Sequence, residues 1–258
     1  MKALLLRLFA ASTPLLTPAL APAAFNPAIV SADARWIVHV DLVTLRESTL
    51  GQALFTSLQQ FAPHLEKGGL RPDFEKILAA AGTITAYGAN FSKDPNDIDG
   101  TLILQGTGEL RKIAEGFVAQ ATVTEPDTVT EIKGLPFEAY SLAGQATIAF
   151  PKEAVILFSK SQAQLVKAYD VYRGSAASLA KNSSSPLALL LPKGGNHYLV
   201  AASEVPTTEG LLPANAPQAR ILQMATAGAI ALGEDKSMTT ARLHLVASTD
   251  EMTMLCAT

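Results

Sequence analysis

The sequence predicts an α+β protein with a mainly antiparallel sheet and helices packed on one face of it. Three observations support this class. Residues 36–41 alternate so that Trp36, Val38 and Val40 share one face, which is typical of a strand. Apolar residues recur at helical spacing further along the chain. Between residues 129 and 159, short apolar stretches are separated by tight turns, and such close spacing permits only antiparallel hairpins.

The other elements follow in order along the chain. After the first strand, Thr44 and Glu47 have capping-box spacing, and Leu50, Leu54 and later apolar residues continue at helical intervals to residue 61. A short helix is expected over 72–81, followed by strands at 84–91 and 101–105. Leu110, Ile113 and Phe117 mark the next helix, the hairpins of 129–159 come after it, and Ser161 and Gly174 bound a further helix.

Residues 175–195 are rich in serine, glycine and proline and are typical of a linker. Beyond them we expect a strand at 197–202, a short helix at 218–225 and strands at 227–232 and 239–246. The chain thus divides into a first α+β unit at 25–174, the linker-like segment 175–195 and a second unit at 196–258. The pattern leaves open whether the two units share one sheet or core.

The order of elements in the second unit suggests an internal duplication of a strand-helix-strand-strand-helix unit. Residues 243–250 parallel residues 102–109, an offset of 141 (243 minus 102), and both read as a strand leading into a capped helix with an acidic first turn. Few residues are identical between the two copies, so chance recurrence of similar elements is the alternative. If the duplication is real, the second copy is incomplete, through a naturally short product or a fragment.

Residues 1–24 have the order of a secretory signal peptide: Lys2, an apolar middle and a small-residue end. A membrane anchor is the alternative, but Arg7 and three prolines would charge or kink a spanning helix. We expect cleavage after Ala23 or Ala24 and a secreted or periplasmic location. No later apolar run approaches the ~18 residues that cross a bilayer, so no membrane span is expected after cleavage.

Charge and motifs exclude several function classes. Removing Lys2 and Arg7 from the 20 basic residues leaves 18 against 23 acidic residues, a net charge of −5. Without clustered Lys and Arg, nucleic acid is not an expected partner. No glycine-rich phosphate loop is present, so no cofactor is predicted. Cys256 is the single cysteine and cannot close a disulfide within the chain.

Two constellations could carry chemistry. His39 and Asp41 lie two apart on a strand, so they share a face and could orient a metal or act as base and orienter. A carboxylate at the end of a strand also commonly caps the next helix, and we favour that structural interpretation of Asp41. Asp94, Asp97 and Asp99 suggest a calcium loop, but the EF-hand register places Pro95 and Gly106 where carboxylates are required. We therefore predict no catalytic residue and no metal ligand.

The run at 36–42 together with residues 45–51 resembles uncharacterised exported bacterial proteins. These begin, after a signal peptide, with a hydrophobic strand ending in Asp and a helix containing Ser-x-Leu-Gly, here Ser48, Leu50 and Gly51. The resemblance implies a cell-envelope or secreted location. It brings no known activity and no functional residues.

These observations favour a non-catalytic protein that binds a macromolecule, such as another envelope or extracellular protein, through a sheet face or edge. The first alternative is a carrier of a small ligand, held between helices and sheet or between the two units. The second alternative is an exported hydrolase whose site is assembled only in three dimensions.

Overall fold

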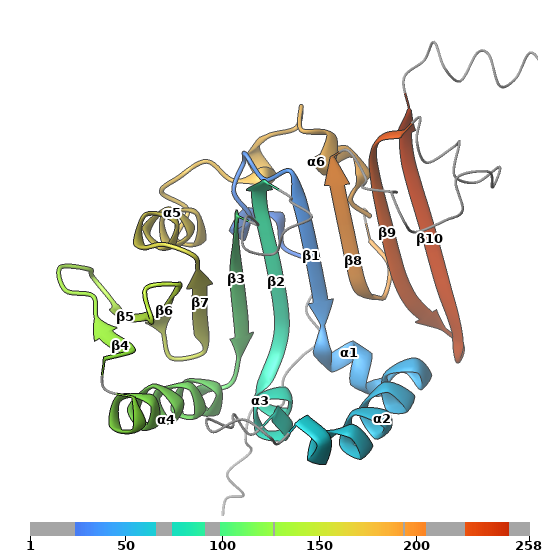
Figure 1. Ribbon diagram of the computed structural model, residues 1–258. Helices are drawn as coiled ribbons and strands as arrows, with labels where there is room; N and C mark the ends of the chain where they lie inside the picture. Colours follow the sequence, from blue (N-terminus) through green and yellow to red (C-terminus); the bar gives the residue numbers. More distant parts are fainter. Residues whose placement is uncertain are drawn as a thin grey trace, which may run out of the picture.

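The computed structural model describes residues 24–65, 74–90, 99–125, 127–192, 194–204 and 225–247 of the 258-residue chain. In this part, ten strands form one sheet in the order β10-β9-β8-β1-β2-β3-β7-β6-β5-β4 (Figure 1). Every neighbouring pair is antiparallel. The predicted α+β class with a mainly antiparallel sheet is confirmed.

The strands are β1 (Trp36–Asp41), β2 (Ala81–Asn90), β3 (Asp99–Gly106), β4 (Val129–Glu131), β5 (Glu138–Leu142), β6 (Ala146–Lys152), β7 (Val155–Ser159), β8 (His197–Glu204), β9 (Ala225–Asp235) and β10 (Met238–Ala247). The helices are α1 (Leu42–Glu47), α2 (Thr49–Leu65), α3 (Phe74–Ala80), α4 (Gly108–Thr124), α5 (Gln162–Tyr172) and α6 (Pro186–Leu190), with short 3-10 turns η1 (Pro27–Ile29) and η3 (Leu179–Lys181). No helix of the described residues is both long enough and apolar enough to cross a membrane.

The central strand β1 defines the two faces of the sheet. Ile37 lies opposite Tyr87 of β2 and Ala202 of β8, and its side chain is buried. Because successive side chains of a strand alternate, Val40 points to the other side. We call the two sides the Ile37 face and the Val40 face. Each carries its own cluster of apolar side chains.

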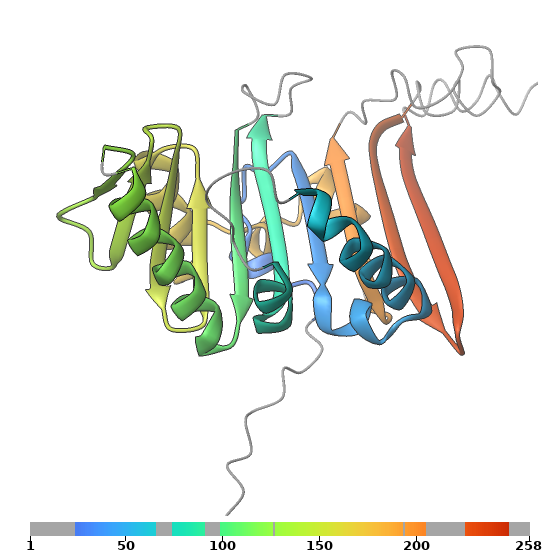
Figure 2. The same ribbon diagram turned by 60° about the horizontal axis from the view of Figure 1, so that its bottom comes forward.

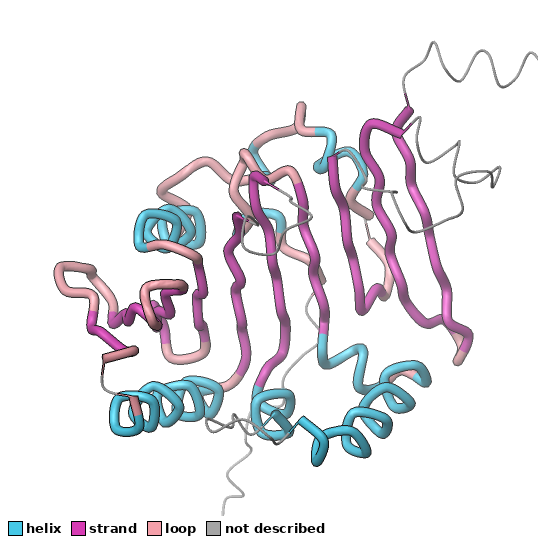
Figure 3. Tube along the Cα trace, viewed as in Figure 1, coloured by secondary structure: helices cyan, strands magenta, loops and turns pink. Residues whose placement is uncertain are grey.

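Helices cover both faces of the sheet, whereas the sequence analysis placed them on one face. The Val40 face packs against α1, α3 and α4, and Figure 2 shows α2, α3 and α4 in front of the sheet. The Ile37 face packs against α5, α6 and η3. Figure 3 separates the continuous sheet from these helical layers. The physical reason lies in interior strands such as β7, where Ile156 and Leu157 point to opposite faces and both are buried.

The linker-like segment 175–195 is part of the core. Leu179, Leu187 and Leu190 are all buried, and the backbone N–H of Leu179 donates to the Val30 carbonyl at 2.8 Å. Ser185 precedes α6, and Pro186 occupies its first turn. Ser178 and Ser185 stand at the N-cap positions of η3 and α6, and Pro186 begins α6, so these residues start short helices within the core.

Local capping explains where the first helices begin. The predicted helix from residue 44 is interrupted: α1 starts at Leu42 behind Asp41, and Ser48 separates it from α2. The Ser48 hydroxyl accepts from the Gly51 N–H at 3.0 Å, which satisfies one amide of the new helix. The predicted cap at Ser161 is confirmed, since its hydroxyl accepts from the Gln164 N–H. Gly174 follows α5 with φ +82°, as a helix-ending glycine requires.

A single sheet joins the two expected units. Strands β1-β2-β3 and β8-β9-β10 are three-stranded meanders that meet where β1 pairs antiparallel with β8. The expected strands 197–202, 227–232 and 239–246 lie within β8, β9 and β10. Residues 218–224 of the expected short helix lie outside the described residues, and Ala225 begins β9. Residues 1–23 and 248–258 also lie outside the described part.

Candidate functional site

His39 and Asp41 are buried in separate structural contacts. The His39 Nδ1 atom lies 2.9 Å from the Thr85 hydroxyl of β2, and the ring meets Phe25 edge-on with centroids 5.3 Å apart. Asp41 accepts from the Val43 N–H at 3.0 Å, from the Thr44 N–H at 3.1 Å and from the Thr44 hydroxyl at 2.7 Å. Its carboxylate therefore caps α1, which accounts for an acidic residue at this buried position.

The acidic residues considered for calcium divide between two parts of the chain. Asp94 and Asp97 lie outside the described residues. Asp99 begins β3, and its carboxylate accepts from the Gln164 side-chain amide of α5. Among the described residues, no group of three His, Cys, Asp or Glu side chains is placed to hold a metal ion.

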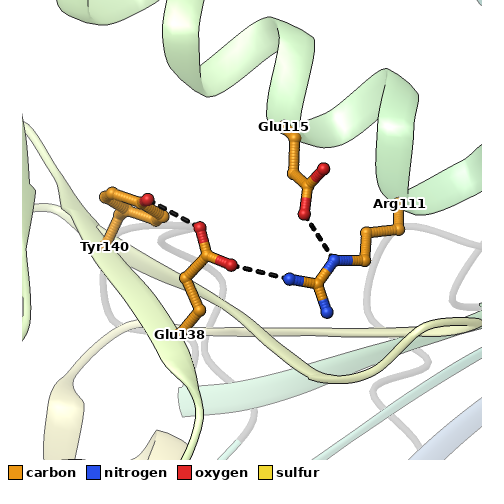
Figure 4. Close-up of polar contacts among 4 residues, drawn as sticks. All are labelled: Arg111, Glu115, Glu138 and Tyr140. Atoms are coloured by element: carbon orange, nitrogen blue, oxygen red, sulfur yellow. Dashed lines mark hydrogen bonds and ion pairs between the residues drawn. The ribbon is translucent and has the colours of Figure 1, made fainter.

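The polar cluster in Figure 4 joins α4 to the sheet end formed by β4 and β5. Arg111 of α4 forms ion pairs with Glu115 on its own helix and with Glu138 of β5, the latter at 2.6 Å. The Tyr140 hydroxyl donates to Glu138 at 2.7 Å, and this hydrogen bond raises the pKa of Tyr140 to about 12. The guanidinium also lies over the Phe150 ring. Both carboxylates, Glu115 and Glu138, form ion pairs with Arg111. The cluster therefore has the character of a structural contact between α4 and β5.

The sequence does not predict this cluster, because Arg111 and Glu138 are 27 positions apart (138 minus 111) and on different elements. Arg111 and Glu115 have the spacing of a helical ion pair, which was the one available signal. Glu138 contacts Arg111 because helix α4 packs beside strand β5. This placement cannot be read from local spacing.

A hollow of substantial volume adjoins each face of the sheet. The larger, of about 910 Å³, lies on the Val40 face and is lined by Trp36, Leu102 and Phe158 with Lys160 and Gln164 nearby. The smaller, of about 340 Å³, lies between the segment following α6 and strands β9 and β10. Both volumes fall in the range of small-molecule pockets, which is roughly 300–1,000 Å³.

The most unusual surface is the sheet end at β10, which we call the β10 surface, residues 238–247. Among the described strands, β10 pairs only with β9, so one long side of it has no strand neighbour. Met238 is 67% exposed and Leu243 is 61% exposed, while Val246 and its neighbour Ile230 on β9 are each more than one-third exposed. A long, apolar edge strand is a template for pairing with another chain.

Among known proteins, solved structures share the fold of this chain. No protein-family model matches the chain, and no curated protein matches it. Among solved structures, the chain is similar to the treponemal protein TP0453 in crystal form III, with 10% identity, a TM-score of 0.53 and coverage of 91% of this chain and 86% of that one. The likeness to crystal form IV has a TM-score of 0.51, 10% identity and coverage of 92% and 84%. At this identity the likeness is one of fold alone.

Proposed function

We propose that this protein acts in the periplasm or at the cell exterior, as a non-catalytic protein that binds another envelope or extracellular protein along β10. The observation that carries the proposal is the long side of β10 that pairs with no other described strand, together with its exposed apolar residues. The signal-like residues 1–24 and the resemblance to exported proteins support the location. Cell fractionation tests it: recovery of the mature chain in the cytosol would overturn the location.

The expected occupant is an extended segment that adds a strand to the sheet. Backbone hydrogen bonds supply affinity in this mode, and alternate side chains supply specificity. On the Val40 face, Leu243 and Leu245 would contact every second side chain of the segment. The pairing of β1 with β8 shows the same kind of contact within the chain, since it joins one meander to another by an antiparallel strand pair.

Charge disfavours a second copy of the chain as the occupant. Directly opposite residues of an antiparallel pair share a face. A two-fold pairing of β10 centred on Arg242 places this cation opposite its own copy. Like charges directly opposite one another are destabilising. This register is therefore disfavoured for a second copy, and we expect a different protein as the partner.

The test uses a matched pair of surface variants. Val123 of α4 is 82% exposed and lies away from β10, so Val123→Lys controls for Leu243→Lys. The purified partner should protect the amides of residues 238–247 from hydrogen exchange in the unmodified chain and in the control, and should fail to bind Leu243→Lys. Protection elsewhere only, or binding unaffected by Leu243→Lys, would overturn the proposal. Light scattering that shows a homodimer through β10 would also overturn it.

The second candidate function is a small-ligand carrier, and the hollow beside Trp36 favours it. Trp36 forms part of the lining, and an added Cβ at Gly100 would lie 2.9 Å from its ring, so the glycine permits this position of the indole. Trp36 is the single tryptophan of the sequence, so its fluorescence reports on the hollow directly. Native mass spectrometry that finds a bound compound, which also changes this fluorescence, would support a carrier. A ligand-free spectrum would count against it.

We also propose that the two meanders arose by duplication of one unit. In support, Leu102 of β3 and Leu243 of β10, which are 141 positions apart, both belong to the third strand of their meander. Superposing the two meanders tests the idea. The offset of 141 should bring Leu102 onto Leu243 with the same side-chain direction, and a best fit with β10 shifted by one residue would contradict it.

A further inference from the structure

The smaller hollow lies on the Ile37 face, away from Trp36. Leu190, Leu191 and Pro192 form one wall, and the small side chains Ala229 and Ala231 of β9 lie opposite them. Ala229 and Ala231 are largely buried beneath this segment. Alanines at these positions leave space that larger strand residues would fill. The hollow is therefore an apolar slot between strand β9 and the residues at the end of α6.

The charged side of the slot is entirely basic. Among the described residues that line it, the ionisable side chains are Arg242 and His244 of β10, and none is acidic. Glu234 of β9 points to the other face, where its carboxylate accepts from the Thr49 N–H at 2.7 Å. In the described part of the chain no ion pair joins Arg242 to an acidic residue. Arg242 is thus a positive group at the mouth of the slot with no acidic counter-charge among the described residues.

The charge of Arg242 also acts on His197, which lies outside the residues that line the slot. Its ring packs against β9, since an added Cβ at Gly233 would lie 3.1 Å from Nδ1. Neither ring nitrogen has a partner in hydrogen-bond geometry. Burial lowers the pKa of His197, the charge of Arg242 lowers it further, and the backbone of Gly194 offsets only part of this effect. An anion bound beside Arg242 would offset this positive charge.

We propose that this slot binds a carboxylate that carries a short apolar chain. The carboxylate pairs with Arg242, whose guanidinium can donate two parallel hydrogen bonds, and the apolar chain lies along Leu191 and Ala231. The size of the slot suits a single short chain. Two sources offer this chemistry: a free aliphatic carboxylate, and the C-terminal carboxylate of a peptide with apolar last residues.

Titrations of the full-length mature chain with octanoate, followed by amide NMR, test the proposal. We expect saturable shifts at Leu191, Ala231 and Arg242. Octylammonium, which has the same chain and the opposite charge, should cause none of them. A tripeptide acid Ala-Leu-Leu and its C-terminal amide separate the two sources: binding of the acid alone assigns the site to peptide carboxylates, and binding of octanoate alone assigns it to free aliphatic carboxylates.

Two variants complete the test. Arg242→Gln should weaken binding of the carboxylate about tenfold, the loss expected for one charge-assisted contact. Arg173→Gln removes an exposed cation of the segment following α5 and should leave binding unchanged. Leu189→Glu adds a negative charge beside the slot and should also weaken binding. Equal affinity of Arg242→Gln and the unmodified chain, equal binding of octylammonium, or no binding by any carboxylate would overturn the proposal.

Discussion

The two meanders of the sheet have the same strand order, but their outer strands differ in whether a further strand pairs with them. In β1-β2-β3, the outer strand β3 pairs with β7, and its residue Ile103 is fully buried. In β8-β9-β10, the outer strand β10 has no further neighbour among the described strands, and Leu243 is mostly exposed. The two strands carry similar apolar patterns. Ile103 lies on the Ile37 face and Leu243 on the Val40 face, so the strand neighbours and the layer that covers each face together decide whether a side chain is buried.

A pair of substitutions tests this contrast with the largest expected effect. Ile103→Ala removes a buried side chain and should lower the free energy of unfolding by about 3 kcal/mol, from lost burial and the cavity left behind. Leu243→Ala at the exposed position should change it by less than about 0.5 kcal/mol. Urea denaturation gives both values. Similar losses for the two variants would mean that β10 is covered in solution.

A second pair of substitutions tests whether α6 contributes to stability by covering the Ile37 face beside β9. Leu187 of α6 is fully buried and Leu189 is 67% exposed. Leu187→Ala should cost about 2–3 kcal/mol of stability, and Leu189→Ala should be nearly neutral. Thermal unfolding followed by circular dichroism measures both. If residues 175–195 were a tether, the two variants would behave alike.

The end of β1 offers a third test, because this strand leads directly into a capped helix. Asp41→Ala should cost about 1–2 kcal/mol through loss of the cap to the Val43 and Thr44 amides. Asp41→Asn keeps an acceptor oxygen and should cost less. Chemical denaturation compares the two. An equal loss in both variants would indicate that the charge of Asp41, and not the cap, supports this corner.

The smallest effect is expected at the opposite end of the sheet, where Glu138 ties β5 to α4. Glu138→Gln should cost about 0.5 kcal/mol, less at high salt, because the ion pair is partly exposed. It should also lower the pKa of Tyr140 from about 12 toward its ordinary value near 10. Because the folded-state pKa is raised, the stabilisation from Tyr140 is present below about pH 10 and is lost as pH rises toward 12.

NMR titration of the Tyr140 ring measures this shift. Glu115→Gln is the matched control, since it removes the other carboxylate on Arg111 and keeps the hydrogen bond from Tyr140 to Glu138. An unchanged pKa in Glu138→Gln would show that burial, and not this bond, sets the titration of Tyr140.

Local sequence was sufficient where the physics is local. The alternation at 36–41, the hairpin spacing at 129–159 and the Ser161 cap each depend on residues within a few positions, and each predicted element is present. At 175–195 the local pattern predicts a linker, whereas the structure buries several of its leucines in the core. Serine and proline favour helix starts as well as linkers, and only burial of Leu179 and Leu187 distinguishes the two.

The candidate surfaces depended on distant partners. Arg111 of α4 meets Glu138 of β5, and the apolar slot brings Leu191 near Arg242, although these two residues are 51 positions apart (242 minus 191). No sequence period records such distances, since they follow from which strand lies beside which.

The sequence by itself determined the strands, most helices, the hairpins and the overall class, because backbone geometry and capping are decided by nearby side chains. Only the tertiary structure decided that helices cover both faces, that β1 joins β8 and that β10 ends the sheet. The reason is that burial depends on which elements pack together: the same alternation gives a core strand where strands pair on both sides, and an exposed edge where the described sheet ends.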